Sequence, residues 1–419
     1  MIKTNSITTL FLFLSIITSV ISNFFSSLSN SDEILTIVYL IFIFIMLLRN
    51  KGNIDVFFCY CVIVIIITTI IGLLSNHFSG FQITIFPKRV DILMSMKILI
   101  TFTFYYGISF HNTKEYINEK MEVFAKIFIS CLFFLGTISQ FILNDMVLIE
   151  KRYGLRPFKF VYDFAGDTGF LVLALMIIIM LKPNKLKMND YIFILLGGLV
   201  IFETTKIQAM IFPIALLGMG LFKKLKMKVN IGAFSVIGIM LLIAGYSQLQ
   251  DYFLDVYHYS PRKIMLLDSL RLANQNFPLG TGFGSFGSEM AARYYSPIYY
   301  SLGYGNMYGL DGNQDFSTLN DNYLAMLLAQ FGWIGAILYY SLFLIIIKLS
   351  LNLKISRQRI LALSTIITYL IASIGSGSVK SSAGVLGFGL LGIILSDAKK
   401  NIGERDNGEN WNSNITGKF

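Results

Sequence analysis

Four basic residues lie in short segments that separate long apolar blocks, and their chemistry suits the binding of an anion. Arg152 and Arg156 are four residues apart, so they share one face if their segment is helical. Lys206 sits in the turn Glu203-Thr-Thr-Lys206, and Arg262 follows further along the chain. A guanidinium group donates two parallel hydrogen bonds to phosphate oxygens, and an ammonium group adds a compact charge. These residues therefore predict a pyrophosphate-binding pocket.

The same basic residues have a simpler interpretation. Lys and Arg at a membrane–water interface bind anionic lipid headgroups without doing chemistry. Arg271 joins the candidate substrate-binding residues because it shares the polar side of a predicted helix, 260–276, with Asp268. The apolar side of that helix is expected to hold Ile264, Leu267, Leu270 and Ala273, at helical spacing.

A glycine-rich stretch, Pro278–Gly287, follows that helix. Gly280, Gly282 and Gly284 resemble a dinucleotide-binding fingerprint, but that fingerprint needs a preceding buried strand, which this sequence does not predict. Backbone N–H groups in such a turn can approach an anion closely, so these glycines are candidate substrate-binding residues. A tight turn that packs the stretch against neighbouring helices is an equally good interpretation.

The segment Leu319-Asn-Asp-Asn-Tyr-Leu opens a long apolar block and holds the candidate acid–base group. Asp321, with Asn322 beside it, would orient or deprotonate a sugar hydroxyl, and Tyr323 is a candidate substrate contact. The alternative is that Asp321 caps the helix that follows. Six tyrosines suit stacking on sugar rings and a place at the membrane interface equally well; they are Tyr294, Tyr295, Tyr299, Tyr300, Tyr304 and Tyr308.

Neither a metal nor a cofactor is expected. The three cysteines lie inside apolar segments and suit small core positions. The three histidines lie far apart in sequence, and no Asp-x-Asp motif is present to hold a metal–nucleotide complex. Basic residues occur in short clusters rather than on a face with interleaved aromatics, which argues against a nucleic-acid partner.

Composition indicates what positions these residues. The chain has 419 residues, of which 55% are hydrophobic and 14% are charged, with a mean hydropathy of +0.67. Soluble domains carry about 25% charged residues because their surfaces must be wetted. The apolar residues form long blocks of the kind that cross membranes as helices. The sequence therefore predicts an all-α polytopic membrane protein, without a cleavable signal peptide.

Twelve spans are expected. They run roughly over residues 7–25, 33–48, 54–74, 91–110, 122–143, 165–181, 190–204, 207–222, 230–248, 320–347, 359–376 and 381–397. The seventh and eighth are short and nearly fused. The organisation is then spans 1–9 in residues 1–248, with a smaller outer loop near 144–164, a long outer loop at 249–319, and spans 10–12 in residues 320–397. Residues 398–419 are expected to form a disordered tail.

Charge asymmetry orients these spans. With the N-terminus inside, each even-numbered connection is basic, as cytoplasmic loops are; these are Arg49–Lys51, Lys114–Lys120, Lys182–Lys187, Lys223–Lys228 and Lys348–Arg359. Most of the net charge of +10 lies in such clusters. Both termini are therefore expected in the cytoplasm, and the long loop outside.

Together these motifs resemble the O-antigen polymerase and ligase superfamily. The match lies in the arginine ahead of the glycine stretch, the glycines, and the helix that follows; the residues are Arg262, Gly280, Gly282, Gly284, Asn322, Tyr323, Leu324, Gly332 and Gly335. Lys206 stands where the family has an arginine, and Arg152 and Gly154 match a second outer loop. Asp321 stands where ligases usually carry a histidine, which favours a polymerase. The motifs cover about 100 residues, while the architecture covers most of the chain.

The resemblance implies glycosyl transfer at the outer face of a bacterial cytoplasmic membrane. Donor and acceptor would be oligosaccharides linked to undecaprenyl pyrophosphate, polymerised into O-antigen or capsule without a metal. Arg152, Arg156, Lys206 and Arg262 would hold the donor pyrophosphate. Asp321, with Asn322, would orient or deprotonate the acceptor hydroxyl. A chain-length regulator and a flippase are the implied protein partners, beside membrane lipids. The alternatives are a ligase and a transporter of the same substrates; against a transporter, Lys97 and Lys126 lie near enough to span ends to snorkel.

Overall fold

The computed structural model of the chain is helical throughout its regular structure. It describes residues 4–25, 28, 30–49, 55–110, 119–142, 145–182, 185–224, 259–312 and 318–396, with single residues at 232, 235 and 239. Within these residues no strand forms, and two isolated bridges, Val147–Phe158 and Arg152–Leu155, join extended segments. The all-α class predicted from composition is confirmed.

Within the described residues, eight α-helices precede residue 225. They are α1 (Thr4–Phe24), α2 (Ser31–Arg49), α3 (Val56–Phe78), α4 (Ile85–Phe110), α5 (Glu119–Phe141), α6 (Ala165–Met180), α7 (Met188–Glu203) and α8 (Ile207–Lys224). The described segments after residue 258 hold α11 (Pro261–Gln275), α12 (Glu289–Arg293), α13 (Pro297–Ser301), η3 (Tyr304–Asn306), α14 (Tyr323–Leu351), α15 (Ser356–Gly375) and η5 (Gly377–Lys380). A last helix spans Gly384–Ser396.

Seven of the described helices are long and apolar enough to cross a membrane, namely α1 to α5, α14 and α15. Three shorter apolar helices accompany them: Ala165–Met180, Ile207–Leu221 and Gly384–Ser396. This pattern is that of a multi-pass membrane protein. Eleven of the twelve predicted spans overlap a helix, and the ninth, at 230–248, falls almost wholly outside the described residues, as does the 398–419 tail. The total of twelve crossings stays a prediction.

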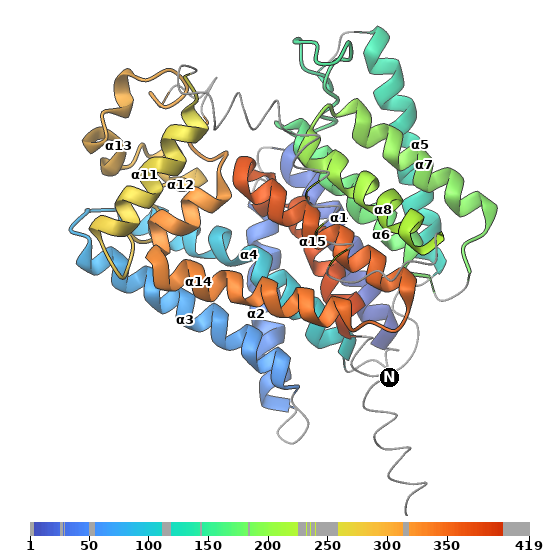
Figure 1. The fold of residues 1–419 in the computed structure, drawn as a ribbon, viewed down its shortest axis with the longest axis horizontal. Helices are drawn as coiled ribbons and strands as arrows, with labels where there is room; N and C mark the ends of the chain where they lie inside the picture. The colour runs from blue at the N-terminus through green and yellow to red at the C-terminus, as the bar shows by residue number, and fades with distance from the viewer. Residues whose placement is uncertain are drawn as a thin grey trace, which may run out of the picture.

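Helix α6 lies at the centre of one half of the bundle. Each of its residues is buried, and it packs against α5, α7, α8 and η5. A helix that is apolar all round has no solvent face and must be enclosed by other helices. Figure 1 shows α5 to α8 gathered on the right, and the short helices α11 to α13 at the opposite, upper left edge. The predicted seventh and eighth spans are separate helices, α7 and α8.

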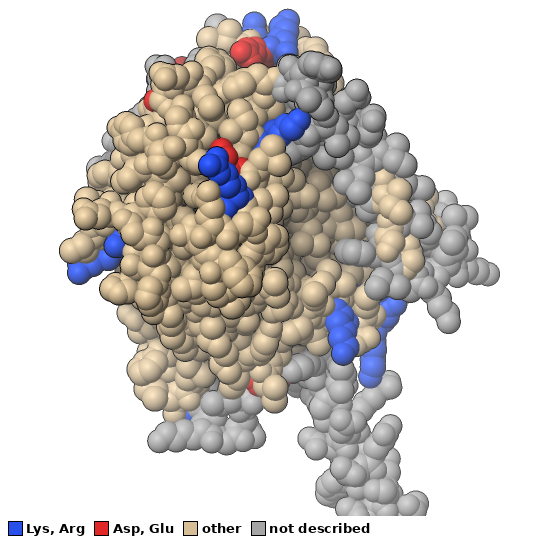
Figure 2. Space-filling model, turned by 60° about the vertical axis from the view of Figure 1, so that its left-hand side comes forward, with Lys and Arg blue, Asp and Glu red and all other residues tan. Residues whose placement is uncertain are grey.

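The bundle exposes apolar side chains where a soluble protein exposes charges. Ile66 and Phe134 are 52% and 63% exposed. In Figure 2 most of one face carries neither basic nor acidic residues, and the few Lys and Arg stand as separate groups rather than as a continuous patch. Such a face suits lipid chains, whereas nucleic acid needs a dense basic surface.

A break in α14 connects the bundle to the segment 259–312. Gly332 has φ 62° and ψ −165°, so the backbone there is not helical. The break leaves the carbonyls of Ala329 and Gln330 to accept from the N–H groups of Thr281 and Gly282, at 2.8 and 2.9 Å. A helix usually kinks where something else satisfies its freed backbone groups. Here the glycine-rich stretch does so.

Residues 259–312 form a compact helical segment whose hydrophobic core also includes Leu319, Ala325 and Ala329. Met265, Leu272, Phe286 and Tyr299 are among its buried residues. The predicted helix 260–276 is present as α11, with Pro261 at its start. Its buried face was predicted only in part, since Ala273 is buried but Leu267 is 56% exposed. The buried residues of α11, which packs on α14, are Met265, Ser269, Leu272 and Ala273.

Candidate functional site

A cavity of about 1230 Å³ lies at one end of the bundle. Three connections of the chain line it, those between α1 and α2, α5 and α6, and α7 and α8. The first turns of α4, the segment before α14 and the link from α15 to the last helix also line it. The basic residues in its lining are Lys97, Arg152, Lys206, Arg262, Arg293 and Lys380. The acidic ones are Asp32, Glu33, Asp91, Asp163, Asp167, Glu289 and Asp321.

Four of the candidate residues predicted from sequence meet in this cavity: Arg152, Lys206, Arg262 and Asp321. Arg262, in the first turn of α11, donates from Nη2 to Oδ2 of Asp321 at 2.7 Å. The two residues are brought together because α11 packs along α14, which begins two residues after Asp321. The guanidinium of Arg262 therefore lines the cavity while it is bound to the carboxylate of Asp321.

Lys206 adds a positive charge to the cavity beside Arg152 and Arg262. It follows the turn between α7 and α8, where Thr205 has φ 53°. Burial and the positive charges of Arg152 and Arg262 lower the pKa of Lys206, and Asp321 acts in the opposite direction. A polyanion bound here would relieve the repulsion among the three cations.

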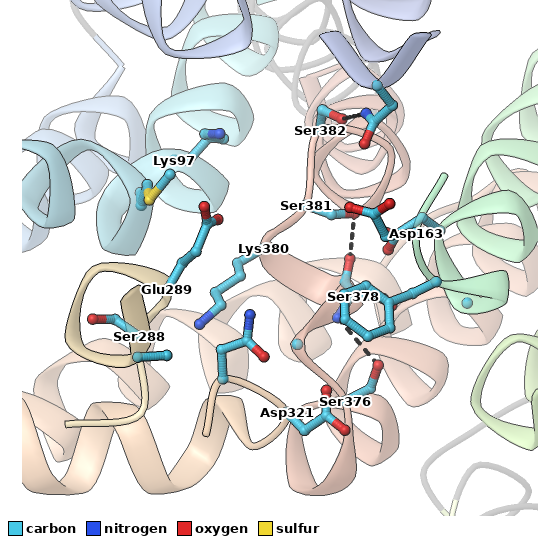
Figure 3. Close-up of a pocket in the computed structure, with 18 of the residues that line it drawn as sticks. Lys97, Asp163, Ser288, Glu289, Asp321, Ser376, Ser378, Lys380, Ser381 and Ser382 are labelled. Carbon is cyan, nitrogen blue, oxygen red and sulfur yellow. Dashed lines mark hydrogen bonds between the residues drawn. The ribbon is translucent and has the colours of Figure 1, made fainter. Parts of the chain in front are cut away.

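Lys380 is a further cation of the cavity that the sequence interpretation missed. It ends η5, and Figure 3 shows its side chain reaching into the cavity from the link between α15 and the last helix. Its Nζ donates to the carbonyl of Gly287 at 3.1 Å. Burial lowers the pKa of Lys380, while Asp91, Glu289 and Asp321 act to raise it. The only signal for it in sequence was a lysine inside a Ser- and Gly-rich turn between two apolar blocks.

Lys97 does not snorkel, contrary to the sequence interpretation. Its Nζ contacts Oδ2 of Asp32 at 2.6 Å and Oε1 of Glu33 at 3.0 Å, and its side chain is 4% exposed. Two carboxylates at the start of α2 thus neutralise one lysine of α4 inside the cavity wall. In Figure 3, Lys97, Glu289 and Lys380 lie on one side of the cavity, opposite Asp163 and Ser378.

The glycines serve packing. A Cβ on Gly280 would lie 2.3 Å from the Ala329 carbonyl oxygen, and one on Gly282 would lie 2.3 Å from the Asn76 side chain. The Gly284 N–H donates to the buried carboxylate of Asp91. None of the three glycines lines the cavity. The glycine-rich turn therefore donates to the side chain of Asp91 in α4, a group of the protein itself, and not to a bound ligand.

Asn322 and Tyr323 take up structural positions. Asn322 caps α14 by accepting from the Ala325 N–H at 3.0 Å, so the cap is Asn322 rather than Asp321. The Tyr323 hydroxyl lies 2.5 Å from that of Tyr339, and Tyr323 is 2% exposed. Neither residue lines the cavity.

Arg156 and Arg271 also lie outside the cavity lining. The segment that carries Arg152 and Arg156 is a tight turn, in which Arg152 and Leu155 exchange backbone hydrogen bonds of 2.8 and 3.0 Å. The shared helical face expected of the two arginines therefore does not exist. Arg271 is exposed on α11.

The tyrosines form the core and surface of the 259–312 segment. Tyr299 and Tyr304 are fully buried and stack with ring centroids 5.5 Å apart. The Tyr304 hydroxyl donates to Asp268 at 2.8 Å, and that of Tyr299 accepts from Gly287. Tyr300 is exposed. None of the six lines the cavity.

In the part of the chain that the structure describes, no three His, Cys, Asp or Glu side chains are grouped so as to hold a metal ion. His111 and His258 lie outside that part. The chemistry open to the cavity residues themselves is the binding of a polyanion and proton transfer by a carboxylate.

The cavity also has an apolar wall. Phe24, Ile34, Ile37, Phe86 and Met94 line it beside the charged groups. Ile34 and Phe86 are 63% and 61% exposed, so this wall continues onto the outer surface of the bundle. The arrangement suits a ligand with an anionic head and an apolar tail.

No family model matches the chain, and no curated protein matches it.

Proposed function

We propose that the protein polymerises lipid-pyrophosphate-linked oligosaccharide repeat units, as a metal-independent glycosyltransferase. The observation that carries the proposal is the meeting of Arg152, Lys206 and Arg262, from three distant segments, in one cavity that also has an apolar wall. A lipid pyrophosphate joins a polyanion to an apolar chain, and this cavity offers a surface to each. Its volume of about 1230 Å³ accommodates sugars beside the pyrophosphate.

The cations have a defined part in the transfer. When a sugar leaves its pyrophosphate, negative charge grows on the departing phosphate oxygen, and preorganised cations stabilise it. Arg262 is held by Asp321 and points into the cavity, while Lys206 adds a compact charge. In this mechanism Asp321 orients Arg262. Asn322, Tyr323 and the three glycines support the fold in this mechanism, and Arg156 and Arg271 lie outside the cavity lining.

Orientation in the membrane follows from charge. Among the described residues, those of the basic connections Lys182–Lys187 and Lys348–Arg359 do not line the cavity. The positive-inside rule assigns them to the cytoplasm and the cavity to the outer face. With the ninth span included, this is the twelve-span arrangement, with both termini in the cytoplasm of a bacterium and residues 249–319 outside. Accessibility of cysteines introduced at 308 and 354 to an impermeant reagent tests it.

Surface-glycan length tests the function. A deletion strain and a complemented strain are compared by gel, with an antibody against the repeat unit. We expect the deletion to leave a single repeat unit on the acceptor and the complemented strain to recover the ladder. The product is O-antigen or capsule according to the acceptor that carries the ladder. Recovery of a full ladder in the deletion strain contradicts the proposal.

A ligase and a flippase are the alternative functions, and the same gel separates them. Loss of all glycan from the acceptor, with long lipid-linked polymer accumulating, indicates a ligase. Repeat units retained inside the cell indicate a flippase. The open cavity with an ion-paired arginine favours an enzyme, since a transporter places its ionisable residues along a path through the bilayer. A polymerase would act beside a flippase and a chain-length regulator.

A further inference from the structure

The carboxylates of the cavity differ in how fully they are bound. Five of the seven that line it are held by cations or by buried donors; they are Asp321 by Arg262, Asp32 and Glu33 by Lys97, Glu289 by Arg293, and Asp91 by the Gly284 N–H and the Gln330 side chain. A carboxylate bound to a cation is a poor acceptor of a substrate proton, because protonation must first break the pair. Asp163 and Asp167 remain.

Asp167 is the buried one of these two. It lies in the first turn of α6 and is 6% exposed, whereas Asp163 is exposed. The neighbouring hydroxyls that stabilise its carboxylate are those of Ser378 and Ser381. Its Oδ1 atom has no hydrogen-bond partner in the described structure, although the residue lines the cavity. A buried carboxylate oxygen without a partner is costly unless a ligand completes it.

Packing brings Asp167 close to the cations. Two residues further along α6, a Cβ on Gly169 would meet Ala209 at 2.4 Å and the Thr204 hydroxyl at 3.6 Å. The start of α6 therefore lies directly against the turn that carries Lys206. Lys206 and Asp167 also interact electrostatically across the cavity wall. Asp167 and Lys206 thus line the same cavity, which is the place proposed for the pyrophosphate.

We propose that Asp167 is the general base that removes the proton from the acceptor sugar hydroxyl. This inference rests on the proposed function. The hydroxyl proton passes to Oδ1 of Asp167, and the sugar oxygen forms a bond to the anomeric carbon of the donor. The bond from that carbon to the pyrophosphate oxygen breaks, and its electron pair leaves with the lipid pyrophosphate, held by Lys206 and Arg262. Asp321, bound to Arg262, takes no proton.

A purely structural role predicts something different. A carboxylate in the first turn of a helix stabilises that helix through its dipole, and such a role requires charge but no access to the cavity. Replacing it would then lower stability and leave the rate per folded molecule unchanged. A proton acceptor instead governs kcat and the acidic side of the pH–rate profile. The titratable groups that act on Asp167 are Lys206, Asp163 and Tyr162.

The test uses the purified full-length protein in lipid nanodiscs with a synthetic polyprenyl-pyrophosphate oligosaccharide. For Asp167→Asn we expect kcat to fall by about 10²- to 10⁴-fold, KM to stay within about twofold, and the rise of rate with pH on the acidic side to vanish. Asp167→Glu is expected to retain part of kcat with that rise displaced. The control is Asp145→Asn, which changes an exposed aspartate outside the cavity. Thermal unfolding of each variant reports folding.

Several outcomes overturn the inference while leaving the proposed function intact. One is a folded Asp167→Asn protein that keeps the wild-type kcat and pH profile. Another is a change in KM alone, which would make Asp167 a binding residue. If Asp167→Asn does not fold, an unmoved pH profile in folded Asp167→Glu overturns it instead. Failure of the wild-type protein to extend any lipid-linked repeat unit would count against the proposed function itself, and with it this inference.

Discussion

Two clusters of charged residues lie at opposite ends of helix α6, and they are built differently. At its C-terminal end Glu122, Lys126, Lys182 and Asp190 form a closed network, in which each lysine contacts both carboxylates. At its N-terminal end the cavity holds Lys206 and Lys380, which make no ion pair within 4.0 Å in the described part of the chain.

The difference separates charges that hold the fold from charges that await a ligand. In the closed network, opposite charges are equal in number, and Lys126 lies 2.6 Å from Oδ1 of Asp190. This network therefore needs no ligand to balance its charge. In the cavity, burial disfavours the charged forms of Lys206 and Lys380, and both lack a close counterion. Proteins keep such groups where binding or catalysis compensates for the cost.

The largest expected effect comes from Arg262 in the open cluster. Arg262→Ala should reduce the rate of polymerisation by about 10²- to 10³-fold, because one donor to the developing negative charge is lost. The length of the polymer that the purified variant makes in nanodiscs in a fixed time measures this reduction. Arg271→Ala is the matched control, since Arg271 is an exposed arginine of the same helix outside the cavity. Full-length polymer from Arg262→Ala at normal expression would contradict the assignment.

The closed cluster should respond in stability and not in rate. Asp190→Asn removes the charge that pairs with Lys126 and Lys182 and is expected to lower the free energy of unfolding by about 2–3 kcal/mol. Thermal unfolding of the purified protein measures this loss. The rate per folded molecule should stay at the wild-type level. A large fall in that rate would mean that the two ends of α6 are coupled and that the comparison between the clusters is wrong.

A similar stability effect is expected where the glycine stretch meets α14. Gly280→Ala places a Cβ 2.3 Å from the Ala329 carbonyl oxygen, and overpacking of this kind costs about 1–3 kcal/mol. The displacement reaches Asp321 through α14, so the rate should fall as well. In Gly198→Ala no atom lies within 4 Å of the new Cβ, and a helical Gly→Ala change stabilises by up to about 1 kcal/mol. Equal behaviour of the two variants would contradict the packing role.

The smallest expected effect is a pH dependence at Lys206. Its lowered pKa means that it loses its proton at a lower pH than a free lysine, so affinity for inorganic pyrophosphate should fall as pH rises through that pKa. Stability should rise over the same window, because the unfolded chain then binds more protons than the fold. Calorimetric titration and thermal unfolding measure the two trends. Lys206→Arg should remove both, and a wild-type affinity that does not change with pH contradicts the charge assignment.

Sequence-based prediction succeeded for the helices of the bundle. An apolar block about 18 residues long can be satisfied in a bilayer only as a helix, whatever surrounds it. Helix α11 could also be predicted, because Pro261 suits a first turn and the residues after it favour a helix. Its buried face could not, because the position of α14 decides which side of α11 is covered.

The candidate site was predicted in part. Arg152, Lys206, Arg262 and Asp321 were recognised as basic or acidic groups in unusual places, and they share the cavity. The uses of the neighbouring residues were not predictable. Asn322 caps α14 in place of Asp321, and Gly284 donates to Asp91. Each of these choices depends on which of two adjacent groups the packed helices bring within hydrogen-bonding distance.

The sequence by itself determined that this chain is an all-α protein with several helices able to cross a membrane, and that basic residues alternate with apolar blocks along it. These properties depend on local composition, which packing does not alter. Only the tertiary structure decided that Asp167, Lys206 and Lys380 face one cavity, and that Asp190 belongs to a closed network at the other end of α6. Contacts between residues so far apart in sequence arise from the packing of whole helices, and no local pattern encodes them.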